Sequence, residues 1–485
     1  MNLFVKKNLE QLLQEAESKE LKRSIGKWAL VALGIGAIIG AGLFVRTAAA
    51  SAESAGAAVT ISFIVAAVGC ALAGLCYAEF ASMIPIAGSA YTYSYATMGE
   101  FVAWFIGWDL VLEYALGAAT VSIAWSEYLN KLLKSVAGWE IPYEWCHSPF
   151  QSDNGVHGIM NIPALFIIFI LTLILIRGVS ESATVNGIIV IVKVAIVILF
   201  IALGWSYINP VNHTPYMIPE GTAGHEGFFE HGWGGILAGA GTVFFAFIGF
   251  DAVSTAAQET KDPKRDMPFG ILVSLAICTV LYILFAHVLT GVANYTEFEK
   301  AGKEASVAYA IETYMTKYSW LALFVTIAIL AGFSSVILVM LLGQSRVFFS
   351  MSKDGLVPPI FSKVHPVYQT PYKSNQIFFI FVGLFAAFIP GDVVGDMTSI
   401  GTLFAFVLVC IGVIIMRKTD PNTPRPFKTP FSPVVPILGA LVCLAMIIGL
   451  GAENWIRLIV WMLIGLVVYF VYGRHHSKLQ KQKVA

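Results

Sequence analysis

Lys193 is the residue of this chain whose position most strongly suggests chemistry. It stands about nine residues into the apolar stretch 184–206, which is roughly 14 Å along a helix that rises about 1.5 Å per residue. An amine at that depth cannot easily extend to water at either end. A desolvated lysine can bind and release a proton, so one interpretation is a proton carrier. The other is a permanent ion pair with an acidic side chain such as Glu113.

The proton-carrier interpretation, which we favour over the ion pair, places the amine between two helices. It would stand where a sodium ion would otherwise bridge the glycine-rich stretch 28–50 and the stretch 318–349. Its predicted partners are the carbonyl of Gly36 or Ile39 and the hydroxyl of Ser334 or Ser335.

Two glycine-rich runs interrupt apolar stretches and predict breaks in the helices. One covers residues 34–42 within stretch 28–50, and the other covers residues 239–251 within stretch 233–257. A glycine destabilises a helix interior by about 1 kcal/mol relative to alanine. Close helix packing through small residues is the simpler interpretation. Paired interruptions in two structural repeats, however, are typical of the binding site of repeat-built transporters, and they predict two unwound segments.

The helix ends created by these breaks have opposite polarity. An outer half-helix that starts after Gly40 presents free N–H groups at mid-membrane, and such a positive helix end suits a carboxylate. The half-helices that end at the breaks present free carbonyls, which suit an ammonium group. An α-amino acid carries both groups on one carbon, so backbone atoms could do most of its recognition. The predicted contacts are Ile38, Ile39, Gly40, Ala41, Gly42, Phe245, Ala246 and Ile248.

Two acidic residues one helical turn apart lie in the apolar stretch 101–130. Glu113 is near mid-depth, whereas Asp109 is closer to one end, so solvation is the simplest expectation for it. Ionisable residues inside a bilayer are costly enough to suggest function. Glu113 could bind the charged end of a cationic substrate side chain. It could instead hold neighbouring helices together, and this second interpretation is the one we favour.

The composition implies that membrane-spanning helices position these residues. Of the 485 residues, 57% are hydrophobic and 12% are charged, against roughly 25% charged in soluble proteins. A spanning helix needs about 20 mostly apolar residues. Twelve stretches qualify, at about 28–50, 58–83, 101–130, 160–177, 184–206, 233–257, 267–293, 318–349, 375–390, 396–416, 433–452 and 455–473.

The lysines and arginines are distributed unevenly between the two sides of these spans. An even number of spans places both termini on one side. Of the 30 basic residues, 22 fall on that side and seven on the other, with Lys193 left inside a span. The positive-inside rule therefore places both termini in the cytoplasm.

The predicted fold class is an all-α integral membrane protein with twelve transmembrane helices. Residues 1–27 are predicted to be an amphipathic cytoplasmic segment, and residues 474–485 a cytoplasmic tail. Spans 1 to 5 occupy residues 28–206 and spans 6 to 10 occupy residues 233–416. Because each repeat has an odd number of spans, the second copy is inverted. Spans 11 and 12 follow at 433–473.

Other classes of function find little support in the sequence. Thirty acidic residues balance the thirty basic ones, so no overall charge attracts nucleic acid. The sequence lacks the phosphate-binding loop of ATP-driven proteins and the zinc-helix motif. It also lacks a channel's selectivity-filter loop and the acid pair or nucleophile–base pair of an intramembrane enzyme. We expect no cofactor and no metal; the expected partners are an L-amino acid, a proton and the lipid bilayer.

Several short motifs resemble those of a known family, the bacterial cationic amino acid transporter branch of the amino acid–polyamine–organocation superfamily. They are Leu21-Lys22-Arg23, Tyr77-Ala78-Glu79-Phe80-Ala81, Ala87-Gly88-Ser89-Ala90-Tyr91, Gly107-Trp108-Asp109-Leu110, Leu112-Glu113-Tyr114, Gly249-Phe250-Asp251 and Lys353-Asp354-Gly355-Leu356. The resemblance implies a leucine-transporter-like fold of five plus five inverted repeats with two extra helices. It also implies alternating access and a proton-site role for Lys193.

Together these features predict a proton-coupled symporter for L-amino acids in the plasma membrane, the inner membrane of a bacterial cell. Cationic substrates and small neutral ones such as alanine both remain open. The vertebrate-type relatives favour cationic amino acids but have fourteen spans, more than this chain can form. An exchanger or polyamine carrier of the same fold is the alternative, and a channel is a remote one.

Overall fold

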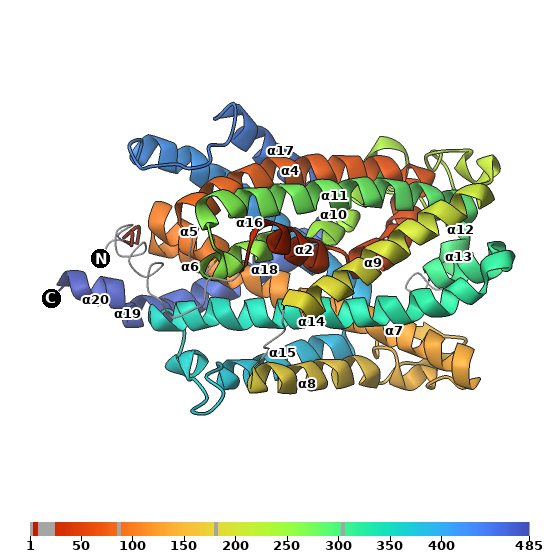
Figure 1. Ribbon diagram of the computed structural model, residues 1–485, viewed down its shortest axis with the longest axis horizontal. Helices are drawn as coiled ribbons and strands as arrows, with labels where there is room; N and C mark the ends of the chain where they lie inside the picture. The colour runs from red at the N-terminus through yellow and green to blue at the C-terminus, as the bar shows by residue number, and fades with distance from the viewer. Residues whose placement is uncertain (1–2, 8–24, 85–88, 179–182, 302–305, 485) are drawn as a thin grey trace.

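The described part of the chain is mostly helical and contains one short two-stranded hairpin. The computed structural model describes residues 3–7, 25–84, 89–178, 183–301 and 306–484. Most helices run along the long axis of the molecule, and both chain ends lie at the same end of it (Figure 1). We call this the terminal end, and the opposite one the distal end.

The first half of the chain contains the helix with the first break and the helix that carries Lys193. Short 3₁₀ and π segments are labelled η. The elements are α2 (Lys27–Ile38), η1 (Gly42–Arg46), α3 (Thr47–Ala50), η2 (Ser51–Ala55), η3 (Gly56–Ala58), α4 (Val59–Met83), α5 (Ser89–Thr97), α6 (Glu100–Val111), η4 (Leu112–Leu116), α7 (Gly117–Ala137), η5 (Tyr143–Trp145), β1 (Ser152–Asp153), β2 (Val156–His157), α8 (Ile162–Arg177), α9 (Ala183–Gly204), η6 (Trp205–Tyr207) and η7 (Pro210–His213). The two strands pair antiparallel.

The second half contains the second break and the helices that enclose it. Its elements are α10 (Gly232–Phe244), η8 (Phe245–Phe247), η9 (Asp251–Glu259), α11 (Pro263–Val292), α12 (Tyr295–Ala301), α13 (Ser306–Tyr314), η10 (Thr316–Tyr318), α14 (Trp320–Lys353), η11 (Pro359–Ser362), α15 (Tyr372–Phe388), α16 (Gly391–Thr419), α17 (Val434–Gly449), α18 (Ala452–Val468), η12 (Tyr469–Gly473), α19 (Arg474–His476) and α20 (Lys478–Val484).

Among the described residues, eight helical segments are long and apolar enough to cross a membrane by their length and composition. Four shorter apolar helices accompany them: α2, α8, α15 and α17. α2 is short because its span breaks after Ile38, and the helical segment beyond the break continues to Met83. The described residues therefore agree with the predicted all-helical membrane class, whereas the count of twelve crossings and the inverted repeat stay predictions.

The broken helix α10–η9 lies at the centre of the bundle. In the segment Gly232–Ser254, 94% of the most apolar 18-residue stretch is buried. The same buried share is 28% in Gly187–Tyr207 and 22% in Ala452–His476. The two outer helices expose apolar side chains such as Ile191 and Val471, as expected for surfaces that meet lipid. Lys193 departs from this pattern, because only 3% of it is exposed although it belongs to one of the outer helices.

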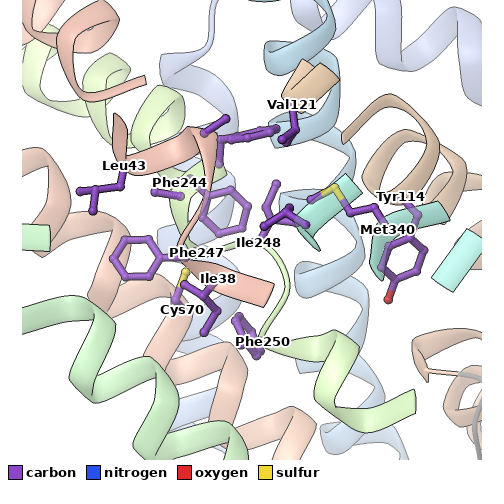
Figure 2. Close-up of a cluster of buried hydrophobic side chains, with 14 of the residues drawn as sticks. Ile38, Leu43, Cys70, Tyr114, Val121, Phe244, Phe247, Ile248, Phe250 and Met340 are labelled. Atoms are coloured by element: carbon purple, nitrogen blue, oxygen red, sulfur yellow. The ribbon is translucent and has the colours of Figure 1, made fainter. Parts of the chain in front are cut away.

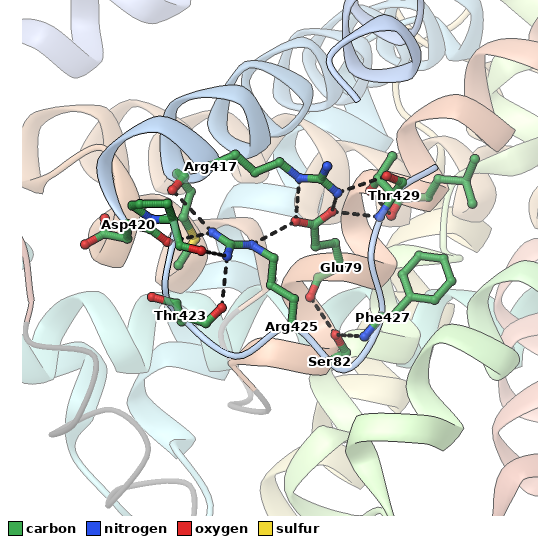
Figure 3. Close-up of polar contacts among 11 residues, drawn as sticks. Glu79, Ser82, Arg417, Asp420, Thr423, Arg425, Phe427 and Thr429 are labelled. Carbon is green, nitrogen blue, oxygen red and sulfur yellow. Dashed lines mark hydrogen bonds and ion pairs between the residues drawn. The ribbon is translucent and has the colours of Figure 1, made fainter. Parts of the chain in front are cut away.

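A buried ionic cluster fixes the helices at the terminal end (Figure 3). Glu79 at the end of α4 is 2% exposed and accepts hydrogen bonds from Arg417 Nε (3.1 Å) and Nη2 (2.6 Å). The Thr429 amide donates to the same carboxylate at 2.8 Å, and Arg425 Nε lies 3.3 Å from it. A buried carboxylate is stable when it is paired and hydrogen-bonded, so Glu79 joins α4 to α16 and to the loop that follows.

Candidate substrate and proton site

The first predicted break appears in the structure after Ile38. Ile39 has an extended backbone (φ −72°, ψ 105°), and its N–H donates to Ile35 O at 2.9 Å, which completes the last turn of α2. Regular structure resumes at Ala41, and Leu43 N donates to Gly40 O at 3.2 Å. Residues 39–40 are therefore the unwound segment. The first amides of the new half-helix have no partner within that helix, as at any helix start.

The second break follows η8 and includes a glycine that its backbone conformation requires. Ile248 has ψ 137°, which ends the helix, and Gly249 has φ 112°. Glycine adopts such a positive φ without steric cost. A Cβ on Gly249 would also lie 2.9 Å from the carbonyl oxygen of Ala37. This glycine therefore permits both the reversal of the chain and its close approach to α2.

The two broken helices touch each other at their breaks. A Cβ on Gly42 would overlap the backbone of Ala246, just as one on Gly249 would press on Ala37. Figure 2 shows the side chains of Ile38, Phe247 and Ile248 gathered around this crossing. The glycines thus serve close packing as well as unwinding, whereas the assignment of a binding site to the paired breaks stays a prediction.

Tyr282 of α11 bridges the two breaks and was not among the residues predicted from the sequence. Its Oη lies 2.9 Å from Ile38 O and 3.0 Å from Ala246 O, which are two of the carbonyls predicted to face an ammonium group. The side chain is fully buried. A hydroxyl can donate only one hydrogen at a time, so the two carbonyls share it. A tyrosine in the middle of an otherwise apolar span was the signal available in the sequence.

The remaining predicted substrate contacts lie close to this crossing. Gly40 faces α14, where a Cβ on it would stand 3.1 Å from Val336 Cγ2. Phe245 lies in η8 directly before Ala246, and both are buried. Ala41 is buried as well and forms the start of the outer half-helix. The structure therefore brings the predicted residues of both runs together.

Lys193 reaches the end of α2 as the proton-carrier hypothesis requires. Its Nζ donates a hydrogen bond to Gly36 O at 2.8 Å. The aliphatic part crosses Gly332 of α14, where a Cβ would lie 2.8 Å from Lys193 Cε. The side chain therefore connects α9, α2 and α14. Ser335 is buried on α14, and the Ser334 hydroxyl donates to Leu330 O at 2.9 Å.

Glu113 lies in the π segment η4 and is fully buried. Its neighbour Tyr114 donates a hydrogen bond from Oη to Asp251, the first residue after the second break, at 2.5 Å. No group of the described residues donates a hydrogen bond to either carboxylate oxygen of Glu113. A hydrogen-bonded ion pair between Glu113 and Lys193, the alternative considered above, is therefore not formed in this structure.

Asp109 corrects one expectation from the sequence. Its position near one end of the span suggested solvation, but the residue is 0% exposed. It lies against α16, where a Cβ on Gly401 would be 3.3 Å from its Oδ1. The expectation was wrong because depth along one helix says nothing about the neighbours that cover it.

Comparison with known proteins shows which class of protein this chain belongs to. A family model described as amino acid permease matches residues 25–476. The chain therefore belongs to the amino acid permease family, which consists of multi-pass membrane transporters and not enzymes. This confirms the resemblance to the amino acid–polyamine–organocation superfamily.

The names of similar proteins refer to different transported compounds. The chain is 44% identical over 481 residues to the branched-chain amino acid permease BcaP of Bacillus subtilis (strain 168), with 99% of each chain covered. It is 41% identical over 482 residues to the methylthioribose transporter of the same organism, with 99% of this chain and 100% of the relative covered. It is 28% identical over 582 residues to the vacuolar cationic amino acid transporter 4 of Arabidopsis thaliana, with 96% and 94% covered.

Proposed function

We propose that this protein is a proton-coupled symporter that takes L-amino acids up across the plasma membrane by alternating access, with both termini in the cytoplasm. The observation that carries the proposal is the 2.8 Å hydrogen bond from Lys193 Nζ to Gly36 O. A protonated amine makes a stronger hydrogen bond than a neutral one. The protonation of Lys193 therefore controls how firmly α2 is held to α9.

Movement of α2 would open the site toward the terminal end. α2 is the half-helix between that end and the break, and Ile38 at its last turn carries a carbonyl proposed to face the substrate ammonium. In the structure the Tyr282 hydroxyl lies within hydrogen-bond distance of that carbonyl and of the Ala246 carbonyl. An ammonium group would share or replace this hydroxyl. Binding of substrate and protonation of Lys193 thus act on the two sides of one short helix.

A neutral, apolar side chain is the substrate feature that the surroundings favour. The labelled side chains around the crossing include Phe244, Phe247, Ile248 and Met340 (Figure 2), and all of them are buried. Burial of an apolar substrate group among them is favourable by roughly 25 cal/mol per Å². The name of the branched-chain permease of Bacillus subtilis agrees with this choice.

A cationic substrate is the second candidate, because Glu113 offers a buried carboxylate. Neither of its oxygens accepts a hydrogen bond from the described residues. A guanidinium or ammonium side chain would supply the missing donors. Labelled leucine, alanine and arginine, tested as competitors of one another, separate the two candidates.

The test of the proposal is uptake by purified protein in proteoliposomes, with and without a pH gradient. We expect saturable, stereospecific uptake that an acidic outside accelerates, and we expect Lys193→Ala to lose this acceleration. Counterflow that is insensitive to pH would identify an exchanger instead. Uptake that does not saturate would identify a channel. An unchanged pH response in Lys193→Ala would remove this lysine from the coupling.

A further inference from the structure

Glu100 is a buried carboxylate at the terminal end that belongs to none of the sites described above. It is the first residue of α6 and is 0% exposed. Tyr95 Oη of α5 donates to it at 2.8 Å and Tyr469 Oη of η12 at 3.0 Å. Its remaining donors come from the C-terminal tail: Ser477 Oγ and, at 3.4 Å, Gln480 Nε2. One carboxylate therefore holds the tail, the end of the last apolar helix and α5 together.

The N-terminal segment reaches the same place from the other end of the chain. Glu100 N donates to Val5 O at 2.9 Å, and Phe101 N donates to Leu3 O at 3.1 Å. Gly99 has φ 98°, and a Cβ on it would lie 2.6 Å from the backbone carbon of Phe4. The close approach of residues 3–5 to the start of α6 thus depends on this glycine.

The two chain ends meet a second time at Asp354, which follows α14. Lys7 Nζ lies 2.6 Å from its carboxylate, and Tyr91 Oη of α5 donates to it at 2.7 Å. Lys478 N, in the tail, donates to the Asp354 backbone oxygen at 3.0 Å. The tail therefore binds the carboxylate of Glu100 and the backbone of Asp354, whereas the N-terminal segment binds the carboxylate of Asp354 and the backbone of Glu100. α5 contributes a tyrosine to each carboxylate.

α5 connects this assembly to the second broken helix. Ser89, its first residue, donates to Asp251 at 3.4 Å, and Asp251 directly follows the unwound segment. The start of α2 is also tied at this end, since Lys261 N, after η9, donates to Ile25 O at 2.9 Å. Asp251 and Ser254, which follow the break on this side, are fully buried, and α5 spans the distance between the chain ends and the break.

We propose that residues 3–7 and 474–480 form a lock that holds the cytoplasmic mouth of the carrier closed through α5. This inference rests on the proposed orientation and alternating access. Opening of the mouth requires the segment after the second break to move, and Ser89 couples that movement to α5. The lock adds donors to Glu100 and Asp354 only in the closed state, so it favours that state. Loosening it shifts the resting carrier toward the open mouth.

Accessibility of a single cysteine tests the lock in the full-length protein. Ser254 of η9 is fully buried, so Ser254→Cys reports opening when a membrane-impermeant maleimide is applied to inside-out vesicles. The lock variant is Ser477→Ala with Gln480→Ala. The control is His475→Ala, which changes an exposed residue of the same tail. The protein with its six native buried cysteines alone supplies the background.

We expect the lock variant to label at position 254 roughly tenfold faster than the parent, since hydrogen bonds to a charged group are lost, while His475→Ala labels at the parent rate. Lys7→Ala, which removes the ion pair with Asp354, provides an independent variant with the same expected direction if the tail variant does not fold. Unchanged labelling in a folded lock variant, or faster labelling from the outside only, overturns the inference. Labelling needs neither substrate nor a pH gradient, so its failure is distinguishable from failure of proton coupling.

Discussion

Gly332→Ala is the sharpest perturbation of the proposed proton site, because it moves Lys193 without removing it. A Cβ at this position would lie 2.8 Å from Lys193 Cε and 3.4 Å from Cγ. Carbon atoms at their optimal contact are about 3.5–4.0 Å apart, so Cε must retreat by roughly 0.7–1.2 Å. The lysine side chain has four rotatable carbons. We therefore expect the amine to shift while the helices keep their places.

The size of the effect follows from the hydrogen bond that this shift breaks. The Nζ to Gly36 O distance is 2.8 Å, and a displacement of that size takes it to roughly 3.5 Å or more, beyond hydrogen-bond range. A hydrogen bond to a charged group contributes about 1.5–3 kcal/mol. A pH gradient should therefore stimulate uptake by the variant roughly ten- to a hundredfold less than it stimulates uptake by the parent protein.

The assay is initial uptake of labelled amino acid into proteoliposomes at a series of outside pH values, alongside counterflow at equal pH. Counterflow should change little, because it needs no net proton movement. Gly187→Ala is the matched control, since it lies on α9 and its Cβ would meet nothing within 4 Å. A Gly332→Ala protein that exchanges substrate normally and keeps the full pH response would refute the reasoning.

Three further predictions test the breaks and the distal end. Tyr282→Phe removes the hydroxyl shared by two carbonyls that we propose face the substrate, so we expect a lower Tm and a larger rise of Tm on adding substrate; an equal rise would separate these carbonyls from the ammonium site. Gly42→Ala should abolish uptake and destabilise the protein by about 1–3 kcal/mol through overpacking, whereas Gly40→Ala, with more room, should retain uptake; equal Tm values for the two variants would contradict the tight crossing. Burial and the nearby His287 lower the pKa of His213 below 6.5. The unfolded state therefore binds more protons than the folded one, and the stability of the fold should decrease as the pH drops through and below 6.5. His213→Gln should lessen this acid-induced fall in Tm, and an identical fall in the variant would show that His213 is not its source.

The local features of the site could be predicted because each of them destabilises the helix that contains it. Glycines that interrupt an apolar run lower helix stability wherever the helix packs, so the break after Ile38 and the one at Gly249 were visible in the sequence. A lysine in the middle of an apolar stretch must find a polar partner, and the carbonyl of Gly36 was among those predicted.

The partners contributed by distant segments could not be predicted. Tyr282 meets Ile38 across 244 residues of sequence, and Glu79 meets Arg417 across 338. A single sequence gives no measure of which tyrosine or arginine faces a given carbonyl or carboxylate. Asp109 was misjudged for the same reason, since its burial depends on α16.

The sequence by itself determined that this chain is a membrane protein with two interrupted helices and one lysine held out of water, because hydropathy and glycine content act locally. Only the tertiary structure decided that the two interruptions cross at Gly42 and that Tyr282 shares their carbonyls. It alone showed that the chain ends close around Glu100. These are contacts between helices, and their geometry is set by how the whole bundle packs.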